Sequence, residues 1–246
     1  MFATSTTDPW LIAAEALAPT PSPYIDDPAL WVVERVREHP WSIQAEVMEA
    51  VRRERYVAVK SCHGVGKSWL ASRLVCWWID IHPVGSAFAV TTAPSGDQVK
   101  VILWREIGVA HERAGLGGKL NERDWKFGRR TVAIGRKPND YSPTIFQGIH
   151  EQHLLIILDE ACGIPQSLWD AARSLMTNAD AHMLAIGNPD DPGSEFARCF
   201  RPDSGWLRLS SETSGPLRYL PQEVTRSRRL RTSSRGARSS EAARRS

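Results

Sequence analysis

Hydrophobic and polar positions follow two patterns along the chain: short continuous apolar runs, and longer segments with apolar residues at helical spacing. The apolar runs predict strands at residues 56–59, 86–91, 131–134, 154–158, 181–186 and 206–210. The helical spacing predicts helices at residues 29–37, 43–53, 69–75, 99–110 and 166–176. Strands that alternate with helices are typical of an α/β fold with a mostly parallel sheet, helices on both faces and ligands at the carboxyl ends of the strands.

The loop between the strand at 56–59 and the helix that follows it suits phosphate binding. Gly64 and Gly66 let the backbone approach an anion, Lys67 supplies a positive charge, and the Ser68 hydroxyl can complete a Mg²⁺ shell. The Walker A pattern would have a glycine at position 61, where this chain has Ser61. The alternative is a turn that only joins strand to helix, but Gly-Lys-Ser with these flanks favours a P-loop. The predicted nucleotide-binding residues of the loop are Ser61, Cys62, His63, Gly64, Val65, Gly66, Lys67 and Ser68.

Two further strands end in polar residues that fit the same chemistry. The apolar run 154–158 is followed by Asp159 and Glu160, a Walker B pattern in which one carboxylate supports Mg²⁺ and the other polarises the attacking water. The alternative is a solvated strand end. Asn188 follows the strand at 181–186, where its amide can contact a terminal phosphate or water. Alone, Gly-Asn-Pro is a turn; its place after a strand of the same sheet favours the functional interpretation.

Composition limits the class of protein. The 246 residues are 42% hydrophobic and 24% charged, as in ordinary soluble proteins, and no run approaches the roughly 20 apolar residues of a membrane span. No positive charge precedes the short apolar piece at the N-terminus, so a secretory signal is not predicted and a cytoplasmic location is expected. The four cysteines form no C-x-x-C pair, which argues for reduced thiols. His150 and His153 lack the spacing of a zinc-protease helix and are interpreted as loop residues.

Charge and proline content divide the chain. Residues 1–29, rich in proline, predict a flexible arm, and residues 30–215 the P-loop domain. From residue 226 on, eight arginines and one acid give +7 against +3 for the whole chain, so residues 1–225 carry −4. The basic segment 216–246 is too polar to fold and is expected to be disordered. One interpretation is that this segment contacts DNA phosphates. The other, which we favour, is that it is a by-product of truncation or of a changed reading frame.

These motifs, in this order, resemble the large terminase subunit of tailed bacteriophages, the ATP-driven motor that packages DNA into a capsid. The resemblance covers residues 31–209 and also includes Trp41-Ser42-Ile43-Gln44, similar to the family's adenine-recognition segment, and Thr91-Thr92-Ala93-Pro94 with Gln98. It implies that Gln44 contacts adenine, Lys67 and Ser68 bind phosphate and Mg²⁺, Asp159 supports Mg²⁺, Glu160 is the catalytic carboxylate and Asn188 couples the γ-phosphate to movement. The implied cofactors are ATP and Mg²⁺. The implied partners are double-stranded DNA, a capsid portal, a small terminase subunit and further copies in a ring, in a phage-infected or prophage-carrying host cell.

Two features depart from the family pattern. Many terminases have an arginine early in the phosphate loop, where this chain has Cys62-His63, so a transition-state arginine must come from Arg105, Arg173 or a neighbouring subunit. The family continues into a two-metal nuclease domain, but after Asp203 the only acids are Glu212, Glu223 and Glu241, so no nuclease activity is expected. The alternatives are a truncated remnant that binds nucleotide or DNA without packaging, and an unrelated P-loop helicase-like ATPase, which the order of Thr-Ala-Pro and Gly-Asn-Pro disfavours.

Overall fold

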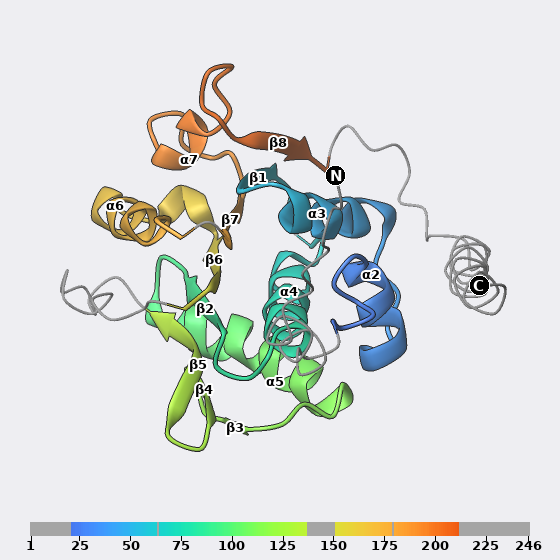
Figure 1. Cartoon of the computed structure of the whole chain (residues 1–246). Coiled ribbons are helices and arrows are strands. Elements are labelled where there is room, and N and C mark those ends of the chain that lie inside the picture. The colour runs from blue at the N-terminus through green and yellow to red at the C-terminus, as the bar shows by residue number, and fades with distance from the viewer. Residues whose placement is uncertain (1–20, 63, 137–150, 179, 212–246) are drawn as a thin grey trace, which may run out of the picture.

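The computed structural model, drawn in Figure 1, describes residues 21–62, 64–136, 151–178 and 180–211. Most of the predicted arm and the whole basic tail at 216–246 lie outside these residues. Within them, the indole Nε1 of Trp77 donates to the Tyr24 carbonyl at 3.0 Å. This hydrogen bond connects the start of the described chain to the body of the domain.

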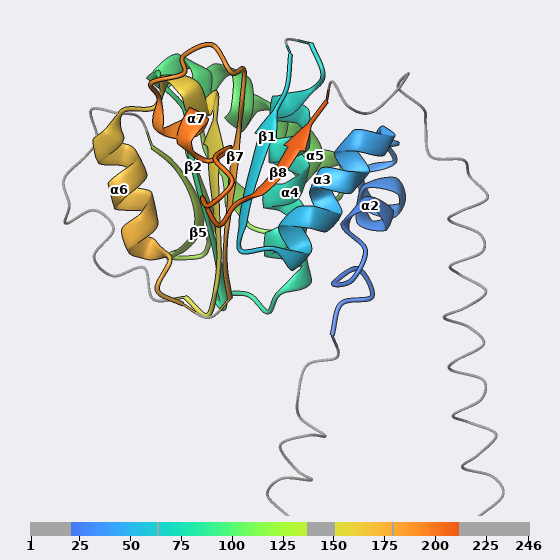
Figure 2. The ribbon, with the colours of Figure 1, turned by 90° about the horizontal axis from the view of Figure 1, so that it is seen from above.

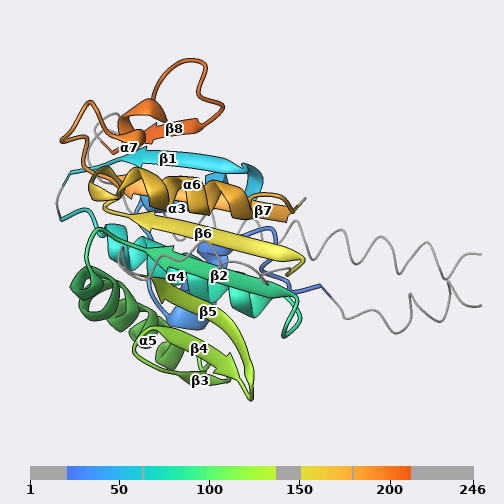
Figure 3. The same cartoon turned by 90° about the vertical axis from the view of Figure 1, so that its left-hand side faces the viewer.

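One eight-stranded sheet organises the domain, in the order β3-β4-β5-β2-β6-β7-β1-β8, which Figure 3 displays from end to end. Neighbours from β5 to β8 are parallel, whereas β3, β4 and β5 pair antiparallel at one edge. The predicted mostly parallel α/β sheet is confirmed. The strands are β1 Tyr56–Lys60, β2 Ala87–Thr92, β3 Lys119–Leu120, β4 Asp124–Phe127, β5 Arg130–Arg136, β6 His153–Asp159, β7 Asp180–Gly187 and β8 Leu207–Ser210.

Helices cover both faces of this sheet, as predicted, and Figure 2 shows the two layers. One layer holds α2 Pro28–Trp31 with the π-helical turn Val32–Val36, α3 Ser42–Arg53, α4 Lys67–Ile81, and the π-helical turn Gln98–Leu103 that continues into α5 Trp104–Arg113. The other holds the short 3₁₀ turn Ala161–Gly163, α6 Gln166–Leu175 and α7 Glu195–Arg198. Each face therefore has its own hydrophobic core.

The two cores explain why the central strands are apolar throughout. Side chains of a strand alternate between faces, so Leu155 and Ile157 pack in the core with α4 while Leu154 and Ile156 pack in the core with α6. Large aromatic side chains fill both cores: Trp31 and Trp77 on the α4 side, Trp169 on the α6 side.

Helix α4 is fixed by a buried guanidinium. Arg73 is 1% exposed and donates to Glu38 at 2.9 Å and to Glu106 at 2.7 Å. Because an unpaired charge in this position would be strongly unfavourable, the three residues hold α4 against α5 and the segment after α2.

Two expectations from the sequence need correction or completion. His153 is the first residue of β6 and not a loop residue, because it pairs with Ala87 of β2 and donates its amide to the Ser86 carbonyl; His150 lies outside the described residues. The antiparallel strands β3 and β4 were not predicted, since β4 has a single buried side chain, Trp125, and β3 has none, which gives no strong alternation. No helix in the described ranges is long and apolar enough to cross a bilayer.

Candidate active site

The loop between β1 and α4 is shaped by two glycines with a left-handed backbone. Gly64 has φ +80° and Gly66 has φ +77°, a conformation that residues with a Cβ adopt only at a cost. A Cβ on Gly66 would also lie 2.8 Å from Nε2 of Gln44. Because α4 begins at Lys67, the amides of its first turn, which lack acceptors within the helix, open onto this loop. The predicted strand, glycine loop and helix start are thus present, while His63 lies outside the described residues.

Lys67 is the point where the predicted site residues meet. Its side chain is 7% exposed, and Nζ lies 3.0 Å from Oδ1 of Asn188, 3.3 Å from the Cys62 carbonyl and 3.2 Å from Oε1 of Glu160. An ammonium group has three N–H donors, and these three acceptors match that number. The structure therefore brings together the loop, the turn after β6 and the end of β7, as the sequence predicts.

A second contact joins the loop helix to β6. The Ser68 hydroxyl donates to Oδ2 of Asp159 at 3.1 Å, and the Glu160 amide donates to Oδ1 of the same carboxylate at 3.0 Å. A hydroxyl and a carboxylate oxygen at this separation are the hard ligands that Mg²⁺ takes alongside water and phosphate. The donor set fits Mg²⁺, as expected for Ser68 and Asp159.

Burial opposes the charge on Asp159. The residue is 3% exposed, and desolvation raises the pKa of its carboxyl to about 6, although the Ser68 hydroxyl and the Glu160 amide stabilise the ionised form. The neighbouring carboxylate of Glu160 raises the pKa further, and Lys67 lowers it. A divalent cation beside Asp159 would favour ionisation, so cation binding and deprotonation of this group are linked.

Glu160 has a strained backbone, and Gly187 makes that backbone possible. Glu160 has φ 48° and ψ 48°, the left-handed region that non-glycine residues seldom adopt. A Cβ on Gly187 would lie 2.9 Å from the amide nitrogen of Ala161, closer than real Cβ contacts. The glycine of Gly-Asn-Pro thus lets the turn after β6 approach the end of β7, which places Asn188 beside Lys67.

Several buried polar atoms without a hydrogen-bond partner lie at the carboxyl edge of the parallel strands. Within the described residues they are Oγ of Ser61 after β1, Oγ1 of Thr92 in β2, Nε of Arg136 in β5 and Oγ of Ser211 after β8. Native interiors leave few such groups unpaired, so their concentration at one edge indicates a site for a polar ligand. Sequence reasoning missed Arg136 and Ser211, which have no local motif; only the register, which pairs Arg136 with Thr92, reveals the former.

Gln44 lies against the phosphate loop, with both ends of its amide engaged. Oε1 accepts from the Trp41 amide at 3.0 Å and so caps α3, and Nε2 donates to the Val65 carbonyl at 3.2 Å. One N–H and one lone pair remain. In this structure Gln44 fixes the loop to α3, and contact with adenine stays a prediction.

A small pocket adjoins Gln44 and the loop. Its polar lining includes the unpartnered hydroxyls of Ser61 and Ser211, and Ser61 donates its amide to the Gly187 carbonyl at 3.1 Å. Its apolar lining comes from α3, α4 and the sheet, through Ile43, Val47, Val59, Leu70 and Ile186. The phosphate loop therefore lies over a small pocket whose lining is apolar on the helix side and carries two hydroxyls at the strand ends.

The two arginines expected from the sequence differ in their surroundings. Arg173 lies on α6, where its guanidinium pairs with Glu195 at 2.7 Å and covers the Trp169 ring. Arg105 is exposed on α5. Neither pairs with the acids of the site within the described residues, whereas Arg136 ends a strand at the site's own edge. The structure thus adds a third candidate.

The fold is that of an α/β domain with a mostly parallel sheet, and a glycine loop joins β1 to α4 at its carboxyl edge. Among solved structures, the chain is similar to the ATPase domain of the large terminase of Thermus phage P74-26, with a TM-score of 0.58 and 20% identity over 75% of this chain and 85% of that one. It is similar to the large terminase of a thermophilic bacteriophage, with a TM-score of 0.56 and 15% identity over 70% of this chain and 46% of that one. It is also similar to the HK97 bacteriophage large terminase, with a TM-score of 0.53 and 13% identity over 71% of this chain and 40% of that one.

This chain therefore has the fold of phage large-terminase ATPase domains, which confirms at the level of fold the resemblance stated from its motifs. It spans less than half the length of the second and third of these terminase chains. No protein-family model and no curated protein matches the sequence.

The raised pKa of Asp159 predicts a specific pH dependence of stability. A folded pKa of about 6, against 3.8 for the ordinary group, gives stability that is present below pH 4 and is lost as the pH rises through 6. Asp159→Asn should remove this loss, raising the unfolding free energy of the ligand-free protein at pH 7.5 by on the order of 1–3 kcal/mol. Urea unfolding of both proteins at pH 4.5 and 7.5 measures this effect. If the unfolding free energy changed by the same amount between the two pH values in wild type and in Asp159→Asn, the prediction would be contradicted.

The close approach at Gly187 predicts a steric penalty. Gly187→Ala should lower the unfolding free energy by about 1–3 kcal/mol, because the new Cβ meets the backbone after Glu160. Gly108→Ala is the matched control: Gly108 is inside α5, its added Cβ meets Leu120 at an ordinary 3.6 Å, and the protein should gain about 0.5–1 kcal/mol. Thermal unfolding compares the two variants, and a Gly187→Ala protein as stable as wild type would refute the argument.

Proposed function

We propose that this chain is the ATP-hydrolysing motor part of a phage terminase large subunit, which drives DNA into a capsid. The observation that carries the proposal is the meeting of Lys67 with Glu160 at 3.2 Å and Asn188 at 3.0 Å, beside the Ser68–Asp159 pair. In-line phosphoryl transfer to water requires a cation on the phosphates, an oxygen cage for Mg²⁺ and a carboxylate near the attacking water. Lys67 is the cation, Ser68 and Asp159 are the Mg²⁺ ligands, and Glu160 is the carboxylate. Glu160 contacts both Lys67 and Asp159.

Nucleotide binding follows from competition for Lys67. A phosphate oxygen is a stronger partner for the ammonium than the neutral Asn188 amide and the Cys62 carbonyl, so phosphate binding replaces these contacts. The amides of the first turn of α4 bind the same anion. Ser68 and Asp159 would hold Mg²⁺, which neutralises charge on the phosphates. The large terminase of the thermophilic bacteriophage has also been solved with ADP, and its TM-score of 0.53 to this chain supports nucleotide as the ligand class.

Glu160 and Asn188 are the residues that we assign to hydrolysis and coupling. When Lys67 turns to phosphate, the Glu160 carboxylate loses its ion pair and becomes free to accept a proton from water. Asn188 loses its Lys67 contact in the same event, so the end of β7 senses whether the terminal phosphate is present. This change is the proposed link between hydrolysis and movement of DNA.

The remaining assignments rest on the fold and the motif order. They are contact with double-stranded DNA, docking to a capsid portal, cooperation with a small terminase subunit, assembly as a ring, and action in the host cytoplasm.

Hydrolysis should depend on Glu160 and respond to DNA. Glu160→Gln should lower kcat by about 100-fold or more while leaving ATP affinity within a few fold, because the amide cannot accept the water proton. Glu122→Gln, at an exposed acid that pairs with Lys100, is the control and should match wild type. Steady-state phosphate release with and without double-stranded DNA measures both. The proposed motor function would be contradicted if the wild-type chain bound ATP without hydrolysing it, or hydrolysed it at the same rate with and without DNA.

The unpartnered Nε of Arg136 predicts which arginine stabilises the transition state. Arg136→Ala should lower kcat by about 100-fold with little change in KM, since transition-state contacts affect kcat. Arg105→Ala should have little effect, and Arg173→Ala should lower stability through its lost pair with Glu195. Turnover assays on the three variants decide the question; full activity in Arg136→Ala would return the role to Arg105 or to a neighbouring subunit.

A further inference from the structure

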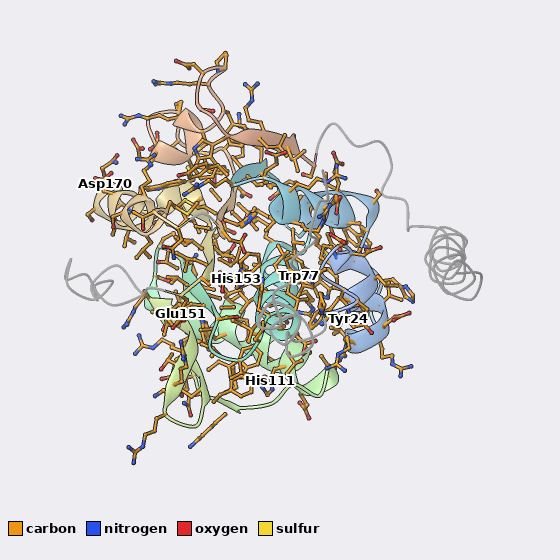
Figure 4. All side chains as sticks on the ribbon, viewed as in Figure 1. Tyr24, Trp77, His111, Glu151, His153 and Asp170 are labelled. Carbon is orange, nitrogen blue, oxygen red and sulfur yellow. The ribbon has the colours of Figure 1, made fainter. Side chains whose placement is uncertain are left out.

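A cluster of histidines lies at the end of the sheet opposite the active site. His82 directly follows α4, His153 begins β6, and Asp180 begins β7. These are the same three elements whose other ends supply Lys67, Asp159 and Asn188. Figure 4 marks His153 beside α4. The cluster therefore occupies the amino edge of the strands, a full strand length from the phosphate loop.

The cluster has the chemical composition of a transition-metal site. One ligand atom from each of His82, His153 and Asp180 lies within 4.8 Å of the other two, and all three residues are buried or half-buried. The two imidazole rings are stacked, with centroids 3.9 Å apart and planes at 22°. Ligands of a tetrahedral Zn²⁺ are about 3.3 Å apart, so rotation of the stacked rings would bring the three atoms to coordination distance.

Neighbouring groups orient these side chains in the way that metal sites require. Nδ1 of His82 lies 2.8 Å from the Trp78 carbonyl, which can only accept, so this nitrogen carries the proton and Nε2 presents a lone pair. Asp180 contacts Nδ1 of His153 and lies 3.0 Å from Nε2 of His182, which fixes its carboxylate between two imidazoles. A cation can take the place of the proton that His153 shares with Asp180, that proton moving to Nε2 of the same ring.

Trp78 gives an independent indication that a polar occupant belongs here. Its ring contacts His82 at 4.7 Å and His182 at 5.3 Å between centroids, and the residue is 3% exposed. Its indole Nε1 is buried and has no acceptor in the described part of the chain. An indole N–H in a protein interior normally finds an acceptor, so an unpaired one in a ring that contacts two of the histidines indicates room for a polar partner there.

We propose that His82, His153 and Asp180 bind one Zn²⁺ ion, with water in the fourth position. Two imidazoles and one carboxylate suit zinc and similar first-row divalent cations, whereas Mg²⁺ and Ca²⁺ prefer all-oxygen sites. The ion joins the ends of α4, β6 and β7 and so holds the three elements of the active site in register from the opposite edge. Because the unfolded chain does not hold these three residues together, Zn²⁺ would bind only the folded chain and would therefore stabilise the fold.

Zinc binding can be measured directly on the full chain, purified without a histidine tag and stripped with a chelator. Equilibrium dialysis against Zn²⁺ alone should give one ion per chain, and the thermal midpoint should rise with Zn²⁺ but not with Mg²⁺ or Ca²⁺. His82→Gln, His153→Gln and Asp180→Asn should each weaken Zn²⁺ binding by about 10-fold or more. Substitution by Co²⁺ should give a spectrum without thiolate charge transfer, which excludes the exposed thiol of Cys62.

Two controls distinguish this site from other Zn²⁺ ligands. His111→Gln changes a histidine that lies on α5, away from the cluster in Figure 4, and Asp159→Asn changes the active site; both should keep wild-type Zn²⁺ affinity. Chelator-treated His153→Gln should unfold near the wild-type temperature, showing that the fold survives. A wild-type chain that binds no Zn²⁺ at micromolar concentrations, or cluster variants that bind it unchanged, would show that the cluster is only a hydrogen-bonded contact and would overturn the proposal.

Discussion

The buried ammonium of Lys67 is the constraint on which the active site depends. A charge with 7% exposure requires partners, and its three come from different parts of the chain: the Cys62 carbonyl, the Glu160 carboxylate and the Asn188 amide. The sheet order makes this possible, because β7 lies between β1 and β6 and all three strands deliver their carboxyl ends to one place. The same contacts that satisfy the lysine therefore assemble the residues to which we assign hydrolysis.

Assembly of these residues opposes local stability at several positions. Glu160 has a left-handed backbone, and Asp159 is a carboxyl whose burial raises its pKa to about 6. Buried polar atoms of Ser61, Thr92 and Arg136 have no hydrogen-bond partner among the residues that the structure describes. Each costs folding free energy in the ligand-free protein, and a charged or polar occupant would relieve the buried carboxyl and the unpaired polar atoms. Because a well-packed apolar sheet surrounds them, the two hydrophobic cores supply the stability that this strained edge lacks.

The sequence predicts most of this architecture where the signal is local. Continuous apolar runs identified β1, β2, β5, β6, β7 and β8, and the strand–loop–helix arrangement placed Lys67 and Ser68 correctly. Features set by long-range pairing were missed. Arg136 has no motif and is significant only through its register with Thr92. His153 was interpreted as a loop residue because its spacing from His150 does not fit a zinc-protease helix, but pairing with β2 makes it the first residue of β6. Gln44 illustrates a different limit: its hydrogen bond to Trp41 is a local cap, whereas its hydrogen bond to Val65 depends on the packing of α3 against the loop.

The elements α4, β6 and β7 each run between the phosphate-binding edge and the histidine cluster, and this gives the two edges a physical connection. Arg73 fixes the middle of α4 through its hydrogen bonds to Glu38 and Glu106. If both proposals hold, an ion that restrains His82, His153 and Asp180 would reduce the conformational freedom that nucleotide binding at Lys67 and Asn188 would otherwise have to remove. By thermodynamic reciprocity, nucleotide would strengthen that restraint by the same factor, so the two edges of the sheet act on one set of rigid elements.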